Sequence, residues 1–164
     1  MTLNPNPPEV DPEQLAERYL AAVEAFAEAV AGVHGDVLDW REREDSWSPR
    51  EIAFHVAELD QLLGLRLRRI LGEDYPPLAG VDTQAGVRLF RRSKLDPGLA
   101  LDSLAATSAL NSAVIEKLSL VDLGRKGRHS QGHDVTAADL GSYMAMHIEA
   151  HIKQIARVVK AARA

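Results

Sequence analysis

Helix-start signals recur at four places along this chain, each at the head of a long segment with helical apolar periodicity. Three signals pair a favoured N-cap residue with a proline at the first helical position, and the fourth is a threonine with an acidic residue three positions later. In chain order they are Asp11-Pro12, Ser48-Pro49, Asp96-Pro97 and Thr136 with Asp139. Apolar residues then recur every three or four positions, as in a helix with one buried face. The pattern predicts four long amphipathic helices and hence a four-helix bundle.

The remaining sequence shows no convincing strand. Aromatic residues make up only 5% of the chain, whereas alanine and leucine are abundant, which favours helices over sheet. The helix that starts at Ser48 is expected to end near Gly72, and residues 73–96 precede the next long helix, with a short helix expected after Asp82. Such a connection can cross the length of the bundle, so the two helices it joins can run parallel. The predicted fold is all-α, a four-helix bundle with a long crossover between helices 2 and 3.

Composition and charge exclude several classes of protein. The formal net charge is −5, so the chain has no global basic field for nucleic acid or anionic lipid. The basic runs at residues 66–69 and 88–92 lack an adjacent aromatic stacking platform and are interpreted as solvated helix faces. No apolar run approaches the roughly 20 residues that a membrane span needs. We therefore expect neither a nucleic-acid partner nor a membrane partner.

Length and cysteine content indicate the organisation and the compartment. With 164 residues the chain is expected to form a single domain over residues 11–164, after a loose, proline-containing lead-in at residues 1–10. The first residues have neither the basic start nor the apolar stretch of a signal peptide. The chain contains no cysteine, so it has no disulfide framework and no thiolate of its own. A cytoplasmic protein is the expectation.

Three histidines fall on helix faces that otherwise look buried. His147 and His151 are four residues apart in the last helix and lie on one face, beside the expected core residues Tyr143 and Met144. Their ring nitrogens can converge on one metal ion, but two half-buried imidazoles that only hydrogen-bond fit the spacing as well. His55 adds a third imidazole on the apolar face of the second helix. Each buried imidazole needs a polar partner, and one metal ion satisfies all three.

Two segments that contain these histidines resemble the DinB/YfiT superfamily. The stretch WSPREIAFHVAELD is similar to the start of the second helix in that family, where Trp-Ser opens the helix and a histidine follows about seven residues later. The stretch GRHSQGHDVTAADLGSYMAMHIEAHIKQI is similar to the closing segment, with its loop histidines and its H-x-x-x-H-x-x-Q-I pattern. The resemblance covers nearly the whole chain and implies a four-helix bundle that binds a divalent metal through His55, His147 and His151.

The resemblance also implies a chemistry. Three neutral nitrogen ligands leave a tetrahedral position open, as in catalytic zinc sites, and zinc or nickel is the expected ion, with iron or copper as alternatives. Relatives imply either a thiol-dependent S-transferase that uses bacillithiol, mycothiol or glutathione, or a metal-dependent hydrolase that uses water. A non-catalytic, stress-related bundle that binds a metal or a ligand is the alternative. The expected partner is a small-molecule substrate. If the protein is the transferase, a low-molecular-weight thiol is one such substrate.

Other residues are weaker candidates for the site. Glu58 lies three residues after His55, and it can act as a general base, orient a ligand or remain a solvated carboxylate. His129 and His133 precede the last helix and could line the mouth of the site, although loop histidines are more often surface groups. Gln154 is expected to make a structural hydrogen bond.

Further expectations concern packing and assembly. Trp47 is interpreted as a packing residue before a helix cap, and Asp60 as a surface residue. Family resemblance and leucines outside the main apolar stripes predict a homodimer. These leucines are Leu62, Leu65 and Leu67.

Overall fold

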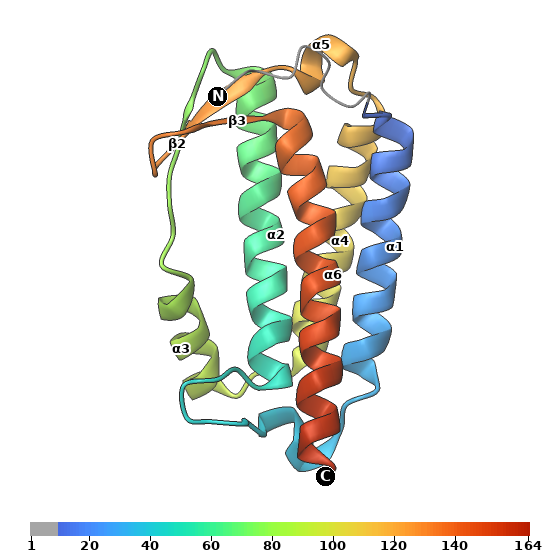
Figure 1. Ribbon diagram of the computed structural model, residues 1–164, viewed down its shortest axis with the longest axis vertical. Helices are drawn as coiled ribbons and strands as arrows, with labels where there is room; N and C mark the ends of the chain where they lie inside the picture. The colour runs from blue at the N-terminus through green and yellow to red at the C-terminus, as the bar shows by residue number, and fades with distance from the viewer. Residues whose placement is uncertain (1–9) are drawn as a thin grey trace.

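Four long helices form the body of the protein in the computed structural model, which describes residues 10–164 (Figure 1). They are α1 (Pro12–Ala31), α2 (Pro49–Gly72), α4 (Pro97–Glu116) and α6 (Ala137–Ala162). Helices α1 and α2 each pack against both α4 and α6, so they occupy opposite corners of the bundle. Helices α2 and α4 run parallel to each other and antiparallel to α1 and α6 (Figure 1). The predicted bundle and its long crossover between α2 and α4 are confirmed.

Shorter elements fill the connections. The crossover contains strand β1 (Pro77–Leu78) and the expected short helix, α3 (Thr83–Ser93), and the other short helices are η1 (Gly35–Asp39) and α5 (Leu120–Leu123). Strands β2 (Lys126–His129) and β3 (Asp134–Thr136) form an antiparallel hairpin, and β1 pairs with β2 in parallel. The sequence predicted no strand, and that prediction is wrong at this end of the bundle. Strands of two to four residues are too short to show an alternating pattern.

The expected lead-in at residues 1–10 lies outside the described residues except for Val10. The expected helix starts are confirmed. Ser48 and Glu51 form a reciprocal capping box at the start of α2, and Thr136 and Asp139 form another at the start of α6.

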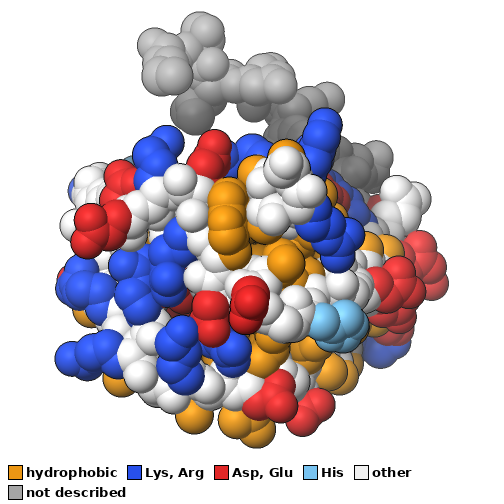
Figure 2. Space-filling model, turned by 90° about the horizontal axis from the view of Figure 1, so that it is seen from below, with side chains coloured by type: hydrophobic (Ala, Val, Ile, Leu, Met, Phe, Trp, Pro, Cys, Tyr) orange, Lys and Arg blue, Asp and Glu red, His pale blue; other side chains and the backbone are white. Residues whose placement is uncertain are grey.

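Glu51 also joins the start of α2 to its surroundings. Its side chain is fully buried and accepts hydrogen bonds from Arg41, at 2.5 Å, and from Arg91 of α3, at 2.6 Å. Figure 2 shows this end of the molecule, where basic side chains gather mainly on one side with acidic ones among them. Arg91, expected on a solvated face, instead ties α3 to α2. This ion-pair cluster fixes the end of α2 that carries His55.

Asp60 is buried, contrary to the expectation from the sequence. Its side chain lies in the interface of α2 with α1 and α4, where Tyr19 Oη donates a 2.6 Å hydrogen bond to Oδ1. Asn111 of α4 donates to Oδ2 at 3.4 Å and accepts from Arg68 at 2.8 Å. A side chain at Gly64 would meet Asn111, whose Cγ lies 2.7 Å from the Cβ position. The glycine therefore admits the amide that completes this polar network.

Leucine exposure differs from the expectation for a dimer surface. Leu67 is fully buried in the core and Leu62 is half-buried, so only Leu65 of the three is exposed. Helix α4 exposes Leu99 and Leu110, and among the described helices it alone is long and apolar enough to cross a membrane by length and composition. It packs between α1 and α2 in the bundle.

Candidate metal centre

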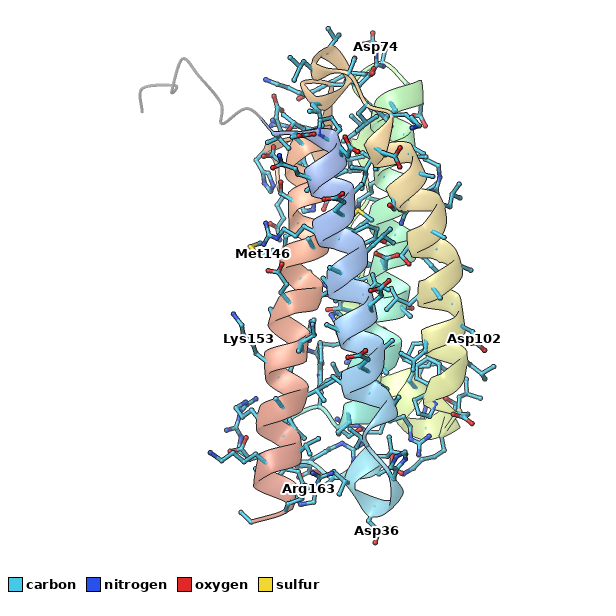
Figure 3. The ribbon with its side chains drawn as sticks, turned by 90° about the vertical axis from the view of Figure 1, so that its right-hand side faces the viewer. Asp36, Asp74, Asp102, Met146, Lys153 and Arg163 are labelled. Carbon is cyan, nitrogen blue, oxygen red and sulfur yellow. The ribbon has the colours of Figure 1, made fainter. Side chains whose placement is uncertain are left out.

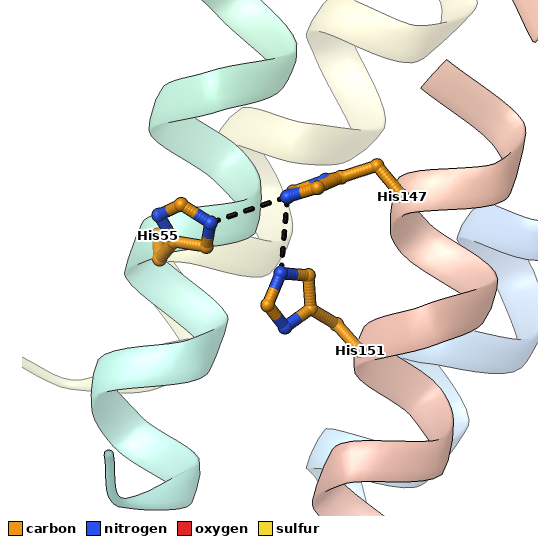
Figure 4. A group of neighbouring side chains, drawn as sticks. All are labelled: His55, His147 and His151. Carbon is orange, nitrogen blue, oxygen red and sulfur yellow. Dashed lines mark hydrogen bonds between the residues drawn. The ribbon is translucent and has the colours of Figure 1, made fainter. Parts of the chain in front are cut away.

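The structure brings His55 of α2 together with His147 and His151 of α6 (Figure 4). His147 Nε2 lies 3.2 Å from His55 Nε2 and 3.0 Å from His151 Nε2. His55 is buried, and the other two are half-buried. Because α2 and α6 run antiparallel side by side, the single histidine of one faces the pair presented on adjacent turns of the other. The spacing of four residues and the apolar face of α2 thus predicted which side chains would meet.

These nitrogen positions fit a metal ion better than a hydrogen-bonded cluster. Two nitrogens bound about 2.0–2.1 Å from one ion at the tetrahedral angle lie about 3.3 Å apart, close to the separations of 3.0 and 3.2 Å here. A neutral imidazole has only one N–H, so hydrogen bonds alone leave part of such a cluster poorly satisfied. In the described part of the chain, no carboxylate or further histidine joins the group. The arrangement could hold one ion with three nitrogen ligands.

Burial favours the neutral, metal-binding form of all three rings. It lowers the pKa of His55 to about 4, and the neighbouring His151 adds a smaller effect in the same direction. It lowers the pKa of His147 to about 3, again helped by the other two rings. Burial also lowers the pKa of His151, and the hydrogen bond that His151 donates to Gln154 opposes this shift. Uncharged imidazoles at neutral pH have the lone pairs that a metal needs.

Gln154 fixes the tautomer of His151. Its Oε1 lies 2.7 Å from His151 Nδ1, and an amide oxygen can only accept, so Nδ1 carries the proton. The lone pair of His151 is then on Nε2, which faces His147. The expected structural hydrogen bond of Gln154 therefore acts directly on the site.

Trp47 covers the site from the segment before α2. Its ring centroid lies 4.6 Å from that of His55 and 6.1 Å from that of His151, and the Trp47 and His151 rings are nearly parallel. The sequence assigned it only a packing role. Its place immediately before the Ser48 cap, about two helical turns before His55, was the signal that could have identified it.

The other candidates lie apart from the three histidines. Glu58 is exposed, and its carboxylate lies against Gly86 of α3. Within residues 10–164 it makes no hydrogen bond to His55, His147 or His151.

The hairpin histidines belong to a neighbouring cavity of about 680 Å³. His129 and His133 stack with ring centroids 4.7 Å apart at its edge and do not join the metal-binding group. Apolar residues of α2 and α6 line much of this cavity. None of the three histidines lines it, but Tyr143 does, and the Tyr143 ring lies 5.7 Å from that of His147. Tyr143 is 42% exposed, so its expected core position is wrong, whereas Met144 is buried as expected. In Figure 3, Met146 of the cavity wall and Lys153 mark the outer side of α6.

Solved structures share the fold. The chain is similar to YfiT from Bacillus subtilis, described as a probable metal-dependent hydrolase with an unusual four-helix bundle topology, with a TM-score of 0.82 and 20% identity over 96% of this chain and 92% of that one. It is also similar to the mycothiol-dependent maleylpyruvate isomerase, with a TM-score of 0.72 and 13% identity over 90% of this chain but only 61% of the isomerase. A mutant of that isomerase gives a TM-score of 0.73, with 11% identity over the same shares of the two chains.

Sequence comparison identifies the family. No curated protein matches the chain. The family model of the DinB superfamily matches residues 11–155, which include α1, α2, α4, the hairpin and all three histidines of the centre. Because this match spans most of the chain, the protein belongs to the DinB superfamily.

Proposed function

We propose that the protein is a metal-dependent enzyme in which His55, His147 and His151 hold one divalent ion and an external thiol is the nucleophile. The convergence of the three Nε2 atoms carries the proposal. Zinc or nickel is the proposed ion, with iron or copper as alternatives, because imidazole suits all four. Bacillithiol, mycothiol and glutathione are the candidate thiols. The likeness to a mycothiol-dependent isomerase supports a small thiol as a substrate.

The residues of the chain orient the ligands and limit access to them. A divalent ion with an open coordination position lowers the pKa of a bound thiol or water towards neutrality. Gln154 holds His151 in the tautomer that presents Nε2, and Trp47 packs over His55 and His151. Tyr143 lies between His147 and the neighbouring cavity, whose wall it forms in part. A substrate that occupies this cavity would therefore approach the centre past Tyr143.

Glu58 stays our candidate general base, although its exposed carboxylate lies towards α3. It is one turn from His55 on α2, and Gly86 admits its carboxylate at the contact with α3, where a Cβ would clash. If Glu58 is only a solvated carboxylate, its substitution should leave the rate unchanged.

Hydrolysis is the second candidate function, and the likeness to YfiT favours it. In that case water takes the place of the thiol. The adjoining cavity supports either enzyme over a non-catalytic bundle, because a closed metal site needs no such space. We further propose a cytoplasmic location and a small-molecule substrate.

The decisive experiment measures consumption of a generic electrophile, such as monobromobimane, by the metal-loaded protein with each of the three thiols. Thiol-dependent turnover should disappear on metal removal and return on remetallation. Glu58→Gln should lower the rate without loss of metal if Glu58 is the base, whereas Asp102→Asn on the surface of α4 serves as a matched control. Metal-dependent turnover of an ester without thiol would instead establish the hydrolase. If all three thiols leave consumption at the metal-free background, the transferase proposal is wrong.

A further inference from the structure

Arg66 of α2 is a buried cation without an anionic partner in the described part of the chain. Its side chain lines the cavity next to the metal centre, and the residue is only 9% exposed. The sequence interpretation placed it on a solvated helix face, and that is wrong. Its guanidinium donates from Nη2 to the carbonyl oxygen of Ala79, which uses one of its five N–H groups.

The remaining hydrogen-bonding capacity of Arg66 is not satisfied. Within residues 10–164, its Nε is the only buried side-chain nitrogen or oxygen without a hydrogen-bond partner, and no carboxylate forms an ion pair with the guanidinium. Asp139 also lines the cavity, but its carboxylate caps α6 by accepting from the Thr136 backbone at 2.9 Å. A buried charge without a partner is costly, and a structural link to one carbonyl does not compensate it.

The charge of the cavity near Arg66 is positive. His129 lines the same cavity, and burial, followed by the charges of Arg66 and His133, lowers the pKa of His129. The charge of Arg66 therefore acts on the hairpin side of the cavity and favours the neutral form of His129. The site lacks the negative group that a guanidinium fork binds best, which is a carboxylate or a phosphate.

The face of α2 between Arg66 and the metal centre is apolar. His55, Leu59, Leu62 and Arg66 follow one another at spacings of four, three and four residues, so they lie in one row, and the last three line the cavity. Eleven residues of helix correspond to about 16 Å, and the arginine side chain points back towards the start of the helix. An occupant held by Arg66 therefore needs an apolar body several carbon atoms long to reach the centre.

We infer that this cavity binds a small organic acid, with its carboxylate on Arg66 and its hydrocarbon body against Leu59 and Leu62. The other end of the acid then lies towards Tyr143, whose ring is 5.7 Å from that of His147. The role of this acid as the electrophilic substrate of the centre rests on the proposed function. Its binding by Arg66 is independent of that function, because Arg66 and the leucines are separate from the three histidines.

Hexanoate is the probe, and calorimetric titration of the metal-loaded protein is the measurement. Hexanamide, which has the same body without the charge, and inorganic phosphate, which has the charge without the body, are the comparison ligands. We expect hexanoate to bind at least about 10-fold more tightly than either, because a charge-assisted bidentate contact and apolar burial act together. Equal or tighter binding of phosphate would overturn the assignment to an organic acid.

Variants separate Arg66 from the metal, since a carboxylate can also bind a metal ion. Arg66→Gln should weaken hexanoate binding about 10- to 100-fold while metal content stays unchanged. Arg69→Gln is the matched control, because Arg69 does not line the cavity and pairs with Glu73. His147→Ala/His151→Ala should lose the metal and still bind hexanoate, even if no thiol chemistry is ever found. The inference would be overturned if hexanoate binding were lost with the metal in the double variant and unchanged in Arg66→Gln.

A second variant guards against failure of Arg66→Gln to fold. Leu62→Glu places a carboxylate four residues before Arg66, in the favourable order for an ion pair on a helix. It should raise the melting temperature, because Arg66 gains a partner, and it should abolish hexanoate binding by competition. Unchanged hexanoate binding in Leu62→Glu would count against the cavity as the site.

Discussion

Gln154 Oε1 lies 2.7 Å from His151 Nδ1, one helical turn along α6, and so determines which nitrogen of that ring is free to bind a metal. Loss of this partner leaves the ring free to rotate and to change tautomer. Gln154→Ala should therefore weaken metal binding by about 10- to 100-fold, whereas Gln154→Glu should retain most of it. Competition with a fluorescent chelator measures the affinity. Gln61→Ala, which removes an exposed hydrogen bond to Ser103, is the control, and equal affinities in all variants would contradict the assignment.

Metal content tests the centre itself. Protein purified without a histidine tag should contain one divalent ion per chain by elemental analysis. His147→Ala/His151→Ala should remove it, because one remaining imidazole cannot hold an ion tightly. His34→Ala is the control, since His34 is exposed at the end of α1. Full metal content in the double variant would place the site elsewhere.

Trp47 should report metal binding through its fluorescence. Its ring lies against His55 and His151, so an open-shell ion such as nickel at the centre is close enough to quench it. Nickel should quench the wild type and Trp40→Phe strongly, and Trp47→Phe only weakly. Similar quenching in both variants would show that Trp47 is not the tryptophan near the ion.

Asp60→Asn should stabilise the protein in a pH-dependent way. Burial raises the pKa of Asp60 from 3.8 to about 6, although Tyr19 and Asn111 donate hydrogen bonds that oppose the shift. The folded state then binds the proton more tightly than the unfolded state. The contribution of Asp60 to stability is thus most favourable below about pH 4 and is lost as the pH rises through 6.

The difference between variant and wild type isolates this group from the histidines. In metal-free protein, urea denaturation at pH 7.5 should show Asp60→Asn more stable by about 1–3 kcal/mol, and the gain should shrink towards zero near pH 4. Asparagine has one acceptor oxygen, which can keep the hydrogen bond from Tyr19, and loss of the second acceptor, which Asn111 uses, offsets part of the gain. A gain independent of pH would mean that the charge of Asp60 is not the cause.

The homodimer stays a prediction, but the structure changes which leucines could form its contact surface. Exposed leucines on α2 and α4 replace the buried Leu67 as the candidate contacts; they are Leu65, Leu99 and Leu110. Light scattering should give twice the chain mass of 17.9 kDa, and Leu110→Glu should lower it because a charge replaces buried apolar surface. A particle of 17.9 kDa at every concentration would contradict the dimer.

Helix starts and the histidine positions could be predicted because their signals are local. The Ser48 cap and the spacing of His147 and His151 are complete within one helical turn. The burial of Asp60 depends on Tyr19, 41 residues away, so no local pattern distinguishes it from a surface carboxylate. Arg66 was misassigned for the same reason. Its burial depends on the crossover near Ala79, which is 13 residues away in the chain and contacts Arg66 only in the folded protein.

The antiparallel contact between α2 and α6 makes the proposed ion a crosslink as well as a reactive centre. His55 and His147 are 92 residues apart in the chain, so an ion that holds both closes a long loop that an unfolded chain would leave open. At a free metal concentration about 1,000 times its dissociation constant, one ion adds about 4 kcal/mol to the free energy of unfolding. Helices α1 and α4 carry none of the three histidines, so the added stability is concentrated where α2 meets α6. If the centre holds the proposed ion, we expect this seam to open first under metal starvation, and the lifetime of the protein in the cell to follow the supply of the metal.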